Sequence, residues 1–69
     1  MNKVSTVALL DKCCICFNGR KEVSYYIFWA DGEEAIKDWI KENVFYEPRI
    51  ISIHKGNKYY IAKVEEWVD

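Results

Sequence analysis

Several features are scarce in this 69-residue chain, and each scarcity excludes a class of protein. Ten Lys and Arg residues are balanced by eleven Asp and Glu residues, so the net charge is −1 at pH 7. No basic surplus therefore indicates a nucleic-acid partner. No apolar run approaches the ~18 residues that a transmembrane helix needs. The run at residues 7–10 is also shorter than the apolar region of a signal peptide. We expect a cytoplasmic protein with no membrane segment.

The composition also excludes a disordered chain and a multidomain chain. Apolar residues make up 51% of the sequence and aromatic residues 16%, with little net charge. These values are typical of a packed globular fold and not of a disordered segment. A chain of this length supports one hydrophobic core, so we expect residues 1–69 to form a single domain. A core this small leaves little room for a deep pocket.

The cysteines are few and closely spaced, at Cys13, Cys14 and Cys16. An odd number in so short a segment cannot build a disulfide framework, and reduced thiols in a reducing compartment are the simpler interpretation. A structural zinc needs four Cys or His ligands. A site of Cys13, Cys16 and His54 would require the backbone to leave the strand, because residues 13 and 16 point to opposite faces. We predict buried structural thiols, no metal and no other cofactor.

Catalytic motifs are also missing. The sequence contains no P-loop, no glycine-rich dinucleotide motif and no nucleophile elbow. His54 has no Ser, Cys or Asp that the sequence places within hydrogen-bond reach of it. We expect that the protein is not an enzyme.

Turn signals divide the rest of the chain into two hairpins. Asn18-Gly19 favours a two-residue turn between a strand ending at residues 13–17 and a strand over residues 23–29. The first strand extends back to about Val4 or bends at Asp11. The predicted pairs are Phe17–Arg20, Ile15–Glu22, Cys14–Val23, Cys13–Ser24, Leu10–Ile27 and Ala8–Trp29. Gly56-Asn57 joins a second hairpin over residues 49–54 and 58–64. One face of that hairpin groups Ile51, Ile53, Tyr60, Ala62 and Val64.

A single helix is predicted between the two hairpins. Asp31 can cap its N-terminus, and Glu34 completes a capping-box-like pair. Apolar residues recur at helical spacing from Ala35 to Val44, and Pro48 prevents the helix from continuing. The predicted fold is a small α+β domain of ββαββ order, an antiparallel sheet with one amphipathic helix packed on one face.

One helix covers only one face of a sheet, and the first hairpin is apolar on both faces. We assign Leu10, Cys14, Val23, Tyr25, Ile27 and Trp29 to the core face. The opposite face then carries Leu9, Cys13, Ile15, Phe17, Tyr26 and Phe28. Soluble monomers seldom expose so much apolar surface. Either the sheet curls to bury both faces, or this face binds a partner protein or a second copy in a homodimer. The predicted partner-binding residues are Ile15, Phe17, Tyr26, Phe28 and Tyr59.

A nucleic-acid interface on the second hairpin is the alternative. Its predicted residues are Arg49, Lys55, Lys58, Tyr59 and Lys63. Basic residues interleaved with sheet aromatics can hold a single strand by charge and stacking. The slightly acidic chain favours a solvated hairpin rim instead.

Three segments together resemble small phage-encoded proteins. They are the helix entry Ala30-Asp31-Gly32-Glu33-Glu34-Ala35-Ile36, the hairpin after it, and the closing Glu66-Trp67-Val68-Asp69. Some anti-CRISPR proteins of phages and mobile elements are similar in size and layout. The resemblance implies a non-enzymatic inhibitor in the host cell cytosol that binds a host defence complex, such as CRISPR-Cas, by surface complementarity. It transfers no specific functional residue.

Overall fold

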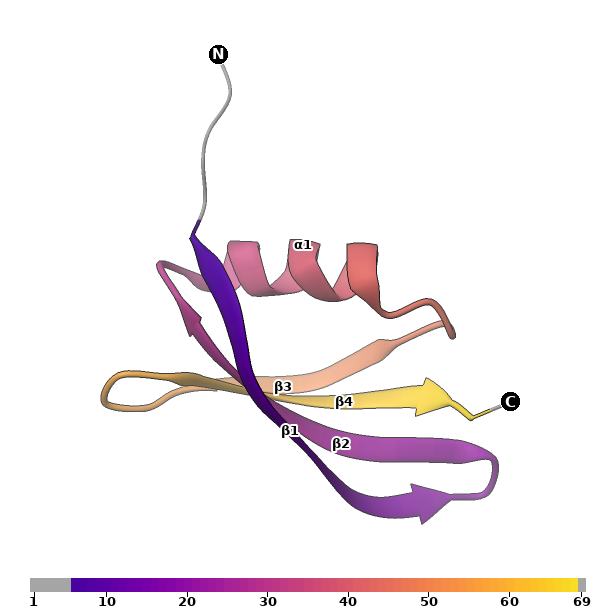
Figure 1. Cartoon of the computed structure of the whole chain (residues 1–69). Coiled ribbons are helices and arrows are strands. Elements are labelled where there is room, and N and C mark those ends of the chain that lie inside the picture. The colour runs from indigo at the N-terminus through magenta and orange to yellow at the C-terminus, as the bar shows by residue number, and fades with distance from the viewer. Residues whose placement is uncertain (1–5, 69) are drawn as a thin grey trace.

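Four strands and one helix make up the computed structural model, which describes residues 6–68 (Figure 1). In chain order they are β1 (Val7–Asn18), β2 (Lys21–Ala30), α1 (Glu33–Asn43), β3 (Arg49–Lys55) and β4 (Tyr60–Trp67). The strands form one antiparallel sheet in the order β1-β2-β4-β3. The prediction of a small α+β fold with an antiparallel sheet and one helix is confirmed. The predicted start of the first strand near Val4 lies outside the described residues.

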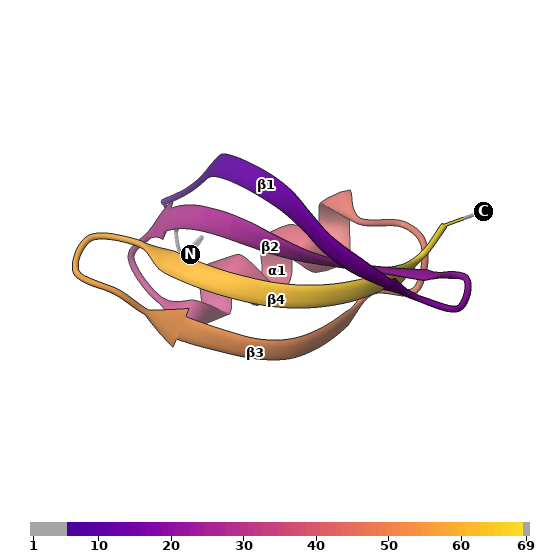
Figure 2. The ribbon, with the colours of Figure 1, turned by 90° about the horizontal axis from the view of Figure 1, so that it is seen from below.

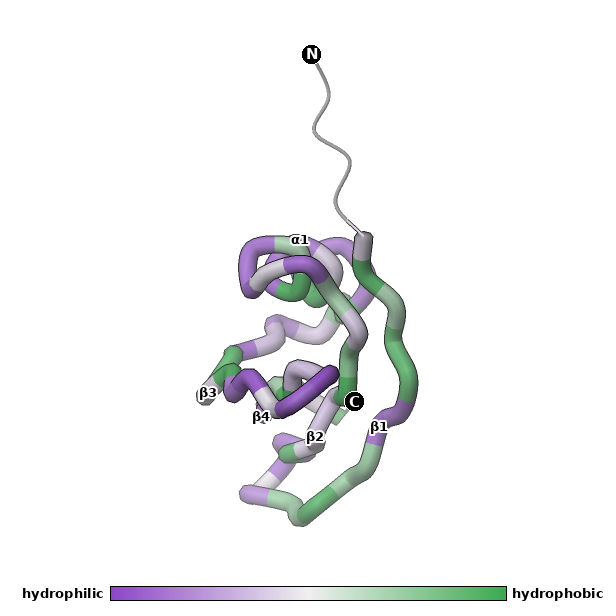
Figure 3. The backbone as a smooth tube through the Cα atoms, turned by 90° about the vertical axis from the view of Figure 1, so that its left-hand side faces the viewer, coloured by the Kyte–Doolittle hydropathy of each residue, from purple (hydrophilic) through white to green (hydrophobic). Residues whose placement is uncertain are grey.

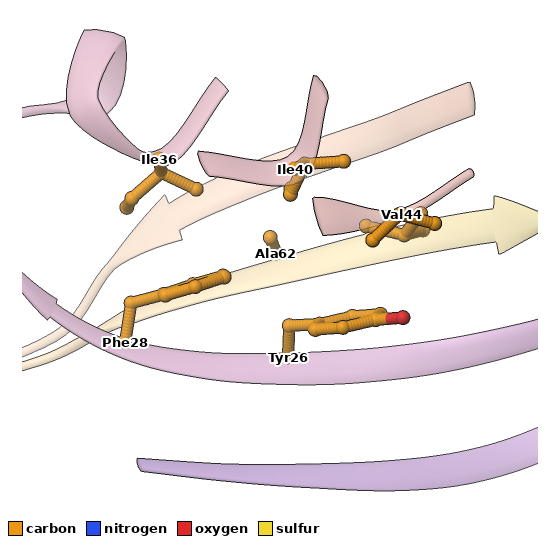
Figure 4. Packing of buried hydrophobic residues seen from close by; sticks show 7 residues of the cluster. Tyr26, Phe28, Ile36, Ile40, Val44 and Ala62 are labelled. Atoms are coloured by element: carbon orange, nitrogen blue, oxygen red, sulfur yellow. The ribbon is translucent and has the colours of Figure 1, made fainter. Parts of the chain in front are cut away.

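The hydrophobic core lies between α1 and one face of the sheet. Seven buried side chains form it: Tyr26, Phe28, Ile36, Ile40, Val44, Ala62 and Val64. Figure 4 shows Ile36 and Ile40 of α1 above Tyr26 and Phe28 of β2, with Ala62 of β4 between them. The Trp39 ring meets the Phe28 ring edge-on at 5.1 Å between centroids. No described element covers the other face of the sheet, which is turned toward the viewer in Figure 2.

The core face of β2 is the one opposite to our prediction. Tyr26 and Phe28 are only 3% and 0% exposed, whereas Tyr25 and Trp29 are 39% and 49% exposed. Both faces of β2 carry large apolar side chains, so strand alternation alone does not identify the covered one. A tyrosine that is buried needs a hydrogen-bond partner for its hydroxyl, and Tyr26 has one. Its hydroxyl donates a hydrogen bond to Glu66 Oε2 at 2.5 Å.

The register of the first hairpin changes along its length. Asn18 pairs with Lys21, so the turn residues are Gly19 and Arg20, and Gly19 has a φ of 67°. Two bulges leave Leu10 and Ile15 unpaired, and each one shifts the register by one residue. The predicted pair Ala8–Trp29 is therefore confirmed, because the two shifts cancel the error at the turn. The other predicted pairs are wrong; the observed ones are Phe17–Glu22, Cys14–Ser24, Cys13–Tyr25 and Asp11–Ile27.

The predicted helix is present, but Asp31 does not cap it. The N-cap residue is Gly32, and no side chain caps the helix there. The Asp31 carboxylate instead accepts a hydrogen bond from the Thr6 amide, and the Asp31 amide donates to the Thr6 carbonyl. These two bonds join the segment before β1 to the entry of α1.

A third bulge corrects our prediction for the second hairpin. It lies between Ile50 and Ser52 of β3, and it leaves Ile51 exposed. Ile50 takes the place that we assigned to Ile51 and pairs with Val64 on the core face. The other members of that face, Ile53, Tyr60, Ala62 and Val64, lie in the core or pack against it as the pattern indicates.

Candidate binding surfaces

The first candidate surface is the outer edge of β1. This strand pairs with β2 on one side and with no described strand on the other. All of its residues after Val7 are exposed. Four large apolar side chains stand on it, Leu9, Leu10, Ile15 and Phe17, and we call this set the β1 edge. At 12 residues, β1 is about twice the mean strand length. An exposed edge strand offers unpaired backbone N–H and C=O groups to an added strand.

The middle of β1 is polar and irregular. In Figure 3 the tube of β1 is mostly hydrophobic, with a hydrophilic interruption at Asp11 and Lys12. The two bulges lie on either side of that interruption. Bulges and edge lysines are the features with which proteins limit unspecific strand pairing. These features limit open-ended self-association through the outer side of β1.

The five predicted partner-binding residues do not form one surface. Ile15 and Phe17 are exposed on β1, and Phe17 is 62% exposed. Tyr26 and Phe28 are core residues, so their assignment to the exposed face is wrong for the reason given above. Tyr59 is exposed beside the β3–β4 turn, and that turn lies at the opposite end of the sheet from the β1–β2 turn (Figures 1 and 2).

The second candidate surface is the uncovered face of the sheet. It contains an open hollow of about 540 Å³ to which all four strands contribute. The lining residues are Asp11, Cys13, Tyr25, Ile27, His54 and Ile61. Sequence reasoning placed Tyr25 and Ile27 in the core and therefore missed this hollow. The signal that could have revealed it is that β2 carries large apolar side chains on both of its faces.

The cysteine prediction needs correction. Cys13, Cys14 and Cys16 are free thiols, but all three are exposed because the edge strand that carries them is not covered by the helix. Partial desolvation and the nearby Glu22 carboxylate raise the pKa of the Cys14 thiol. Within residues 6–68, no group of three or more His, Cys, Asp or Glu side chains is placed to hold a metal ion.

The residues predicted to bind nucleic acid are also partly separated. Arg49 stands at the far end of β3 and pairs with the buried Glu65, with 3.4 Å between Arg49 Nε and Glu65 Oε1. Lys55, Lys58 and Tyr59 lie at or beside the β3–β4 turn. Only these three of the five predicted residues are close together. Lys63 of β4 lies on the uncovered face, where its cross-strand neighbour is Tyr25 of β2.

A polar cluster lies on the helix side of the sheet, next to the core. Glu22 and Glu66 are direct cross-strand partners, an arrangement that is unfavourable for like charges. Lys12 Nζ lies between them, 3.7 Å from Glu22 Oε2 and 3.8 Å from Glu66 Oε2. The Ser24 hydroxyl donates to Glu22 Oε2 at 2.8 Å, and Lys12 also lies 5.2 Å from the centre of the Tyr26 ring. Each group has its partner within the cluster, so its role is structural.

The cluster predicts a dependence of stability on alkaline pH. Burial, together with the hydrogen bond to Glu66, raises the pKa of Tyr26 well above its usual range near 10. The unfolded chain loses this proton first, so the contribution of Tyr26 is complete below about pH 10 and declines as the pH rises further. We expect the free energy of unfolding, measured by urea denaturation under reducing conditions, to fall above about pH 10. The fall should be smaller in Tyr26→Phe; equal profiles for the two proteins would contradict the prediction.

Comparisons with protein-family models, curated proteins and solved structures find no match for this chain. Among the described residues, no helix combines the length and apolar character needed to cross a bilayer. Function must therefore be inferred from the chemistry and geometry of the surfaces described above.

Proposed function

We propose that this chain is a non-enzymatic protein-binding domain whose partner adds an extended strand to the free edge of β1. The observation that supports the proposal most directly is a 12-residue edge strand that is exposed from Ala8 onward. Isolated exposed apolar residues need no explanation, but an apolar strand with a free backbone edge does. The proposal includes the ββαββ arrangement, in which the helix packs on one face and no described strand pairs with the outer side of β1.

Strand addition assigns separate roles to the backbone and the side chains. Backbone hydrogen bonds along β1 supply affinity, while side chains of the β1 edge supply specificity by entering pockets of the partner. Phe17 is the strongest candidate anchor because it is the most exposed large side chain of β1 and aromatic residues are frequent among interface hot spots. Ile15 stands two residues away at a bulge.

A narrower proposal names the kind of partner. The resemblance to small anti-CRISPR proteins supports a host defence complex such as CRISPR-Cas, met in the cytosol of the host cell. A second copy of the chain, paired through β1, is the competing occupant of the same edge.

The test is a comparison of three purified proteins. The double variant Ile15→Ala/Phe17→Ala should bind a copurified, stoichiometric partner about 30-fold or more weakly than the wild type, as expected when hot-spot side chains are removed. Phe45→Ala is the matched control, since Phe45 is 77% exposed but lies in the loop between α1 and β3. Equal affinity of the double variant and the wild type in a calorimetric titration would refute the proposal.

Two further measurements identify the occupant. Sedimentation at micromolar concentration reports self-association. If the wild type is a dimer and the double variant is a monomer, the strand added to β1 is β1 of a second copy. Protection of phage from CRISPR-Cas interference by the wild type and by Phe45→Ala, but not by the double variant, would support the narrower proposal.

A further inference from the structure

We propose that the uncovered face of the sheet binds single-stranded nucleic acid, with bases stacked on its exposed aromatic side chains and phosphates near Lys63. This surface is separate from the β1 edge, so the two proposals can fail independently.

The aromatic side chains of this face come from the central strands. Strand alternation places Tyr25, Ile27 and Trp29 of β2 on it, and Tyr25 and Trp29 are exposed. Ile61 and Lys63 of β4 lie on the same face, as partners of Ile27 and Tyr25. Tyr59 directly precedes β4, and the same alternation places it on this side, next in register to Trp29. Trp29 and Tyr59 therefore lie next to each other at one end of the face, and Tyr25 lies four residues from Trp29 along β2.

The hollow on this face has the chemistry of a base-binding site. Its floor is apolar because Ile27 and Ile61 lie side by side on the two central strands. Tyr25 contributes an aromatic wall, while His54 and Asp11 supply hydrogen-bonding groups at the two outer strands. A nucleobase has flat apolar faces and polar edges, which match a floor and walls of this kind.

The charges near the rings are suited to a polyanion. Lys63 lies on this face beside Tyr25, and Lys58 lies in the turn next to Tyr59; neither has a carboxylate within ion-pair distance among residues 6–68. Lys55 pairs with Tyr60 and belongs to the helix side of the sheet. Glu65 also belongs to the uncovered face, but it is buried and pairs with Lys21 and Arg49. The exposed acid of the hollow is Asp11, on the β1 side.

The helix layer, on the other side of the sheet, has a negative net charge. α1 carries four acidic residues, Glu33, Glu34, Asp38 and Glu42, against Lys37 and Lys41. A chain with a net charge of −1 can therefore still present a locally basic aromatic face. This separation of charge directs a phosphate backbone to the sheet and away from the helix.

The dimensions of the face fix the expected site size. Tyr25 and Trp29 are four residues apart on one strand, which corresponds to about 13 Å. Four-stranded sheets that stack bases on their central strands hold two or three of them. We therefore expect a site of about three nucleotides with little sequence preference.

The experiment is a fluorescence-anisotropy titration of labelled oligo(dT) and oligo(rU), each about 15 nucleotides long. Trp29→Ala should weaken binding by about 5- to 150-fold through the loss of base stacking. Lys63→Gln should lower the slope of log affinity against log salt by about 0.7, the value for one phosphate contact with a single strand. Phe45→Ala is the control and should bind like the wild type. Tighter binding of oligo(rU) identifies RNA as the ligand. Equal binding of the two oligonucleotides shows that the protein recognises the phosphates and base faces that RNA and DNA share.

Three results would overturn the proposal. The first is that neither oligonucleotide binds at low salt. The second is that Trp29→Ala and Phe45→Ala lose equal oligonucleotide affinity. The third is that Trp29→Ala changes the sedimentation of the protein but leaves oligonucleotide binding unaltered. The last result would show that a protein, or a second copy, occupies this face. If circular dichroism shows that Trp29→Ala does not fold, Tyr59→Ala takes its place with the same expected result. Ile15→Ala/Phe17→Ala should retain oligomer binding, which separates this proposal from that for the β1 edge.

Discussion

Replacement of Phe28 by alanine is expected to lower the free energy of unfolding by about 3–5 kcal/mol, the usual cost of truncating a buried phenylalanine. Phe28 is fully buried, stacks beside Tyr26 at 6.1 Å between ring centroids, and meets Trp39 edge-on. The total stability of a chain of this length is roughly 3–10 kcal/mol. Phe28→Ala should therefore leave a large unfolded fraction at 37 °C, visible in urea denaturation and in thermal melting by circular dichroism.

Trp29→Ala is the matched comparison for this prediction. It removes a larger ring from the next position of the same strand, but from the uncovered face, where Trp29 is about half exposed. Its expected cost is about 1 kcal/mol or less, as for surface substitutions in general. A larger loss for Trp29→Ala than for Phe28→Ala would contradict the assignment of the two faces of β2.

Replacement of Lys12 by methionine is expected to cost about 2 kcal/mol. This estimate lies between that for an exposed ion pair and that for a buried one. Lys12 is partly exposed, but Glu22 and Glu66 are mostly buried and lie directly opposite each other on β2 and β4. Without the ammonium group the two carboxylates repel each other in a partly desolvated site. Urea denaturation at pH 7 measures the loss.

A double-mutant cycle separates this repulsion from the loss of the lysine side chain itself. In a Glu22→Gln background one of the two like charges is already neutral, so Lys12→Met should cost less than it does in the wild type. Lys58→Met is the control for a lysine that has no ion pair among the described residues, and it should change stability by less than about 0.5 kcal/mol. An unchanged cost of Lys12→Met in the two backgrounds would contradict a bridging role.

Local sequence signals predicted the elements well and their faces poorly. The spacing of Ile36 and Ile40, together with Pro48, was enough to predict α1, because helix periodicity and helix ends are local properties. The face of β2 depends on which of two apolar surfaces meets the helix, and that is a tertiary property. The two bulges of β1 were not predicted, since Leu10 and Ile15 look like ordinary strand residues in the sequence.

The candidate surfaces followed the same division. Ile15 and Phe17 were assigned to the outer face together with Tyr26 and Phe28, but they are exposed because β1 is an edge strand and not because of that face. Tyr26 and Phe28 could not be distinguished from Tyr25 and Trp29, because the two pairs differ only in strand parity. The hollow on the uncovered face depends on the strand order, which brings β4 beside β2, and no turn signal contains that information.

The position of β4 has a consequence for how the chain folds. Of the four described strands, β4 is synthesised last, yet it lies in the interior of the sheet between β2 and β3. Its partners in β2 precede it by about 40 residues, as in the pair Glu22–Glu66. The first hairpin can form early from local contacts, but its core face has no adjoining strand until β4 arrives. A growing chain should therefore complete the four-stranded sheet only after residues 60–67 have left the ribosome.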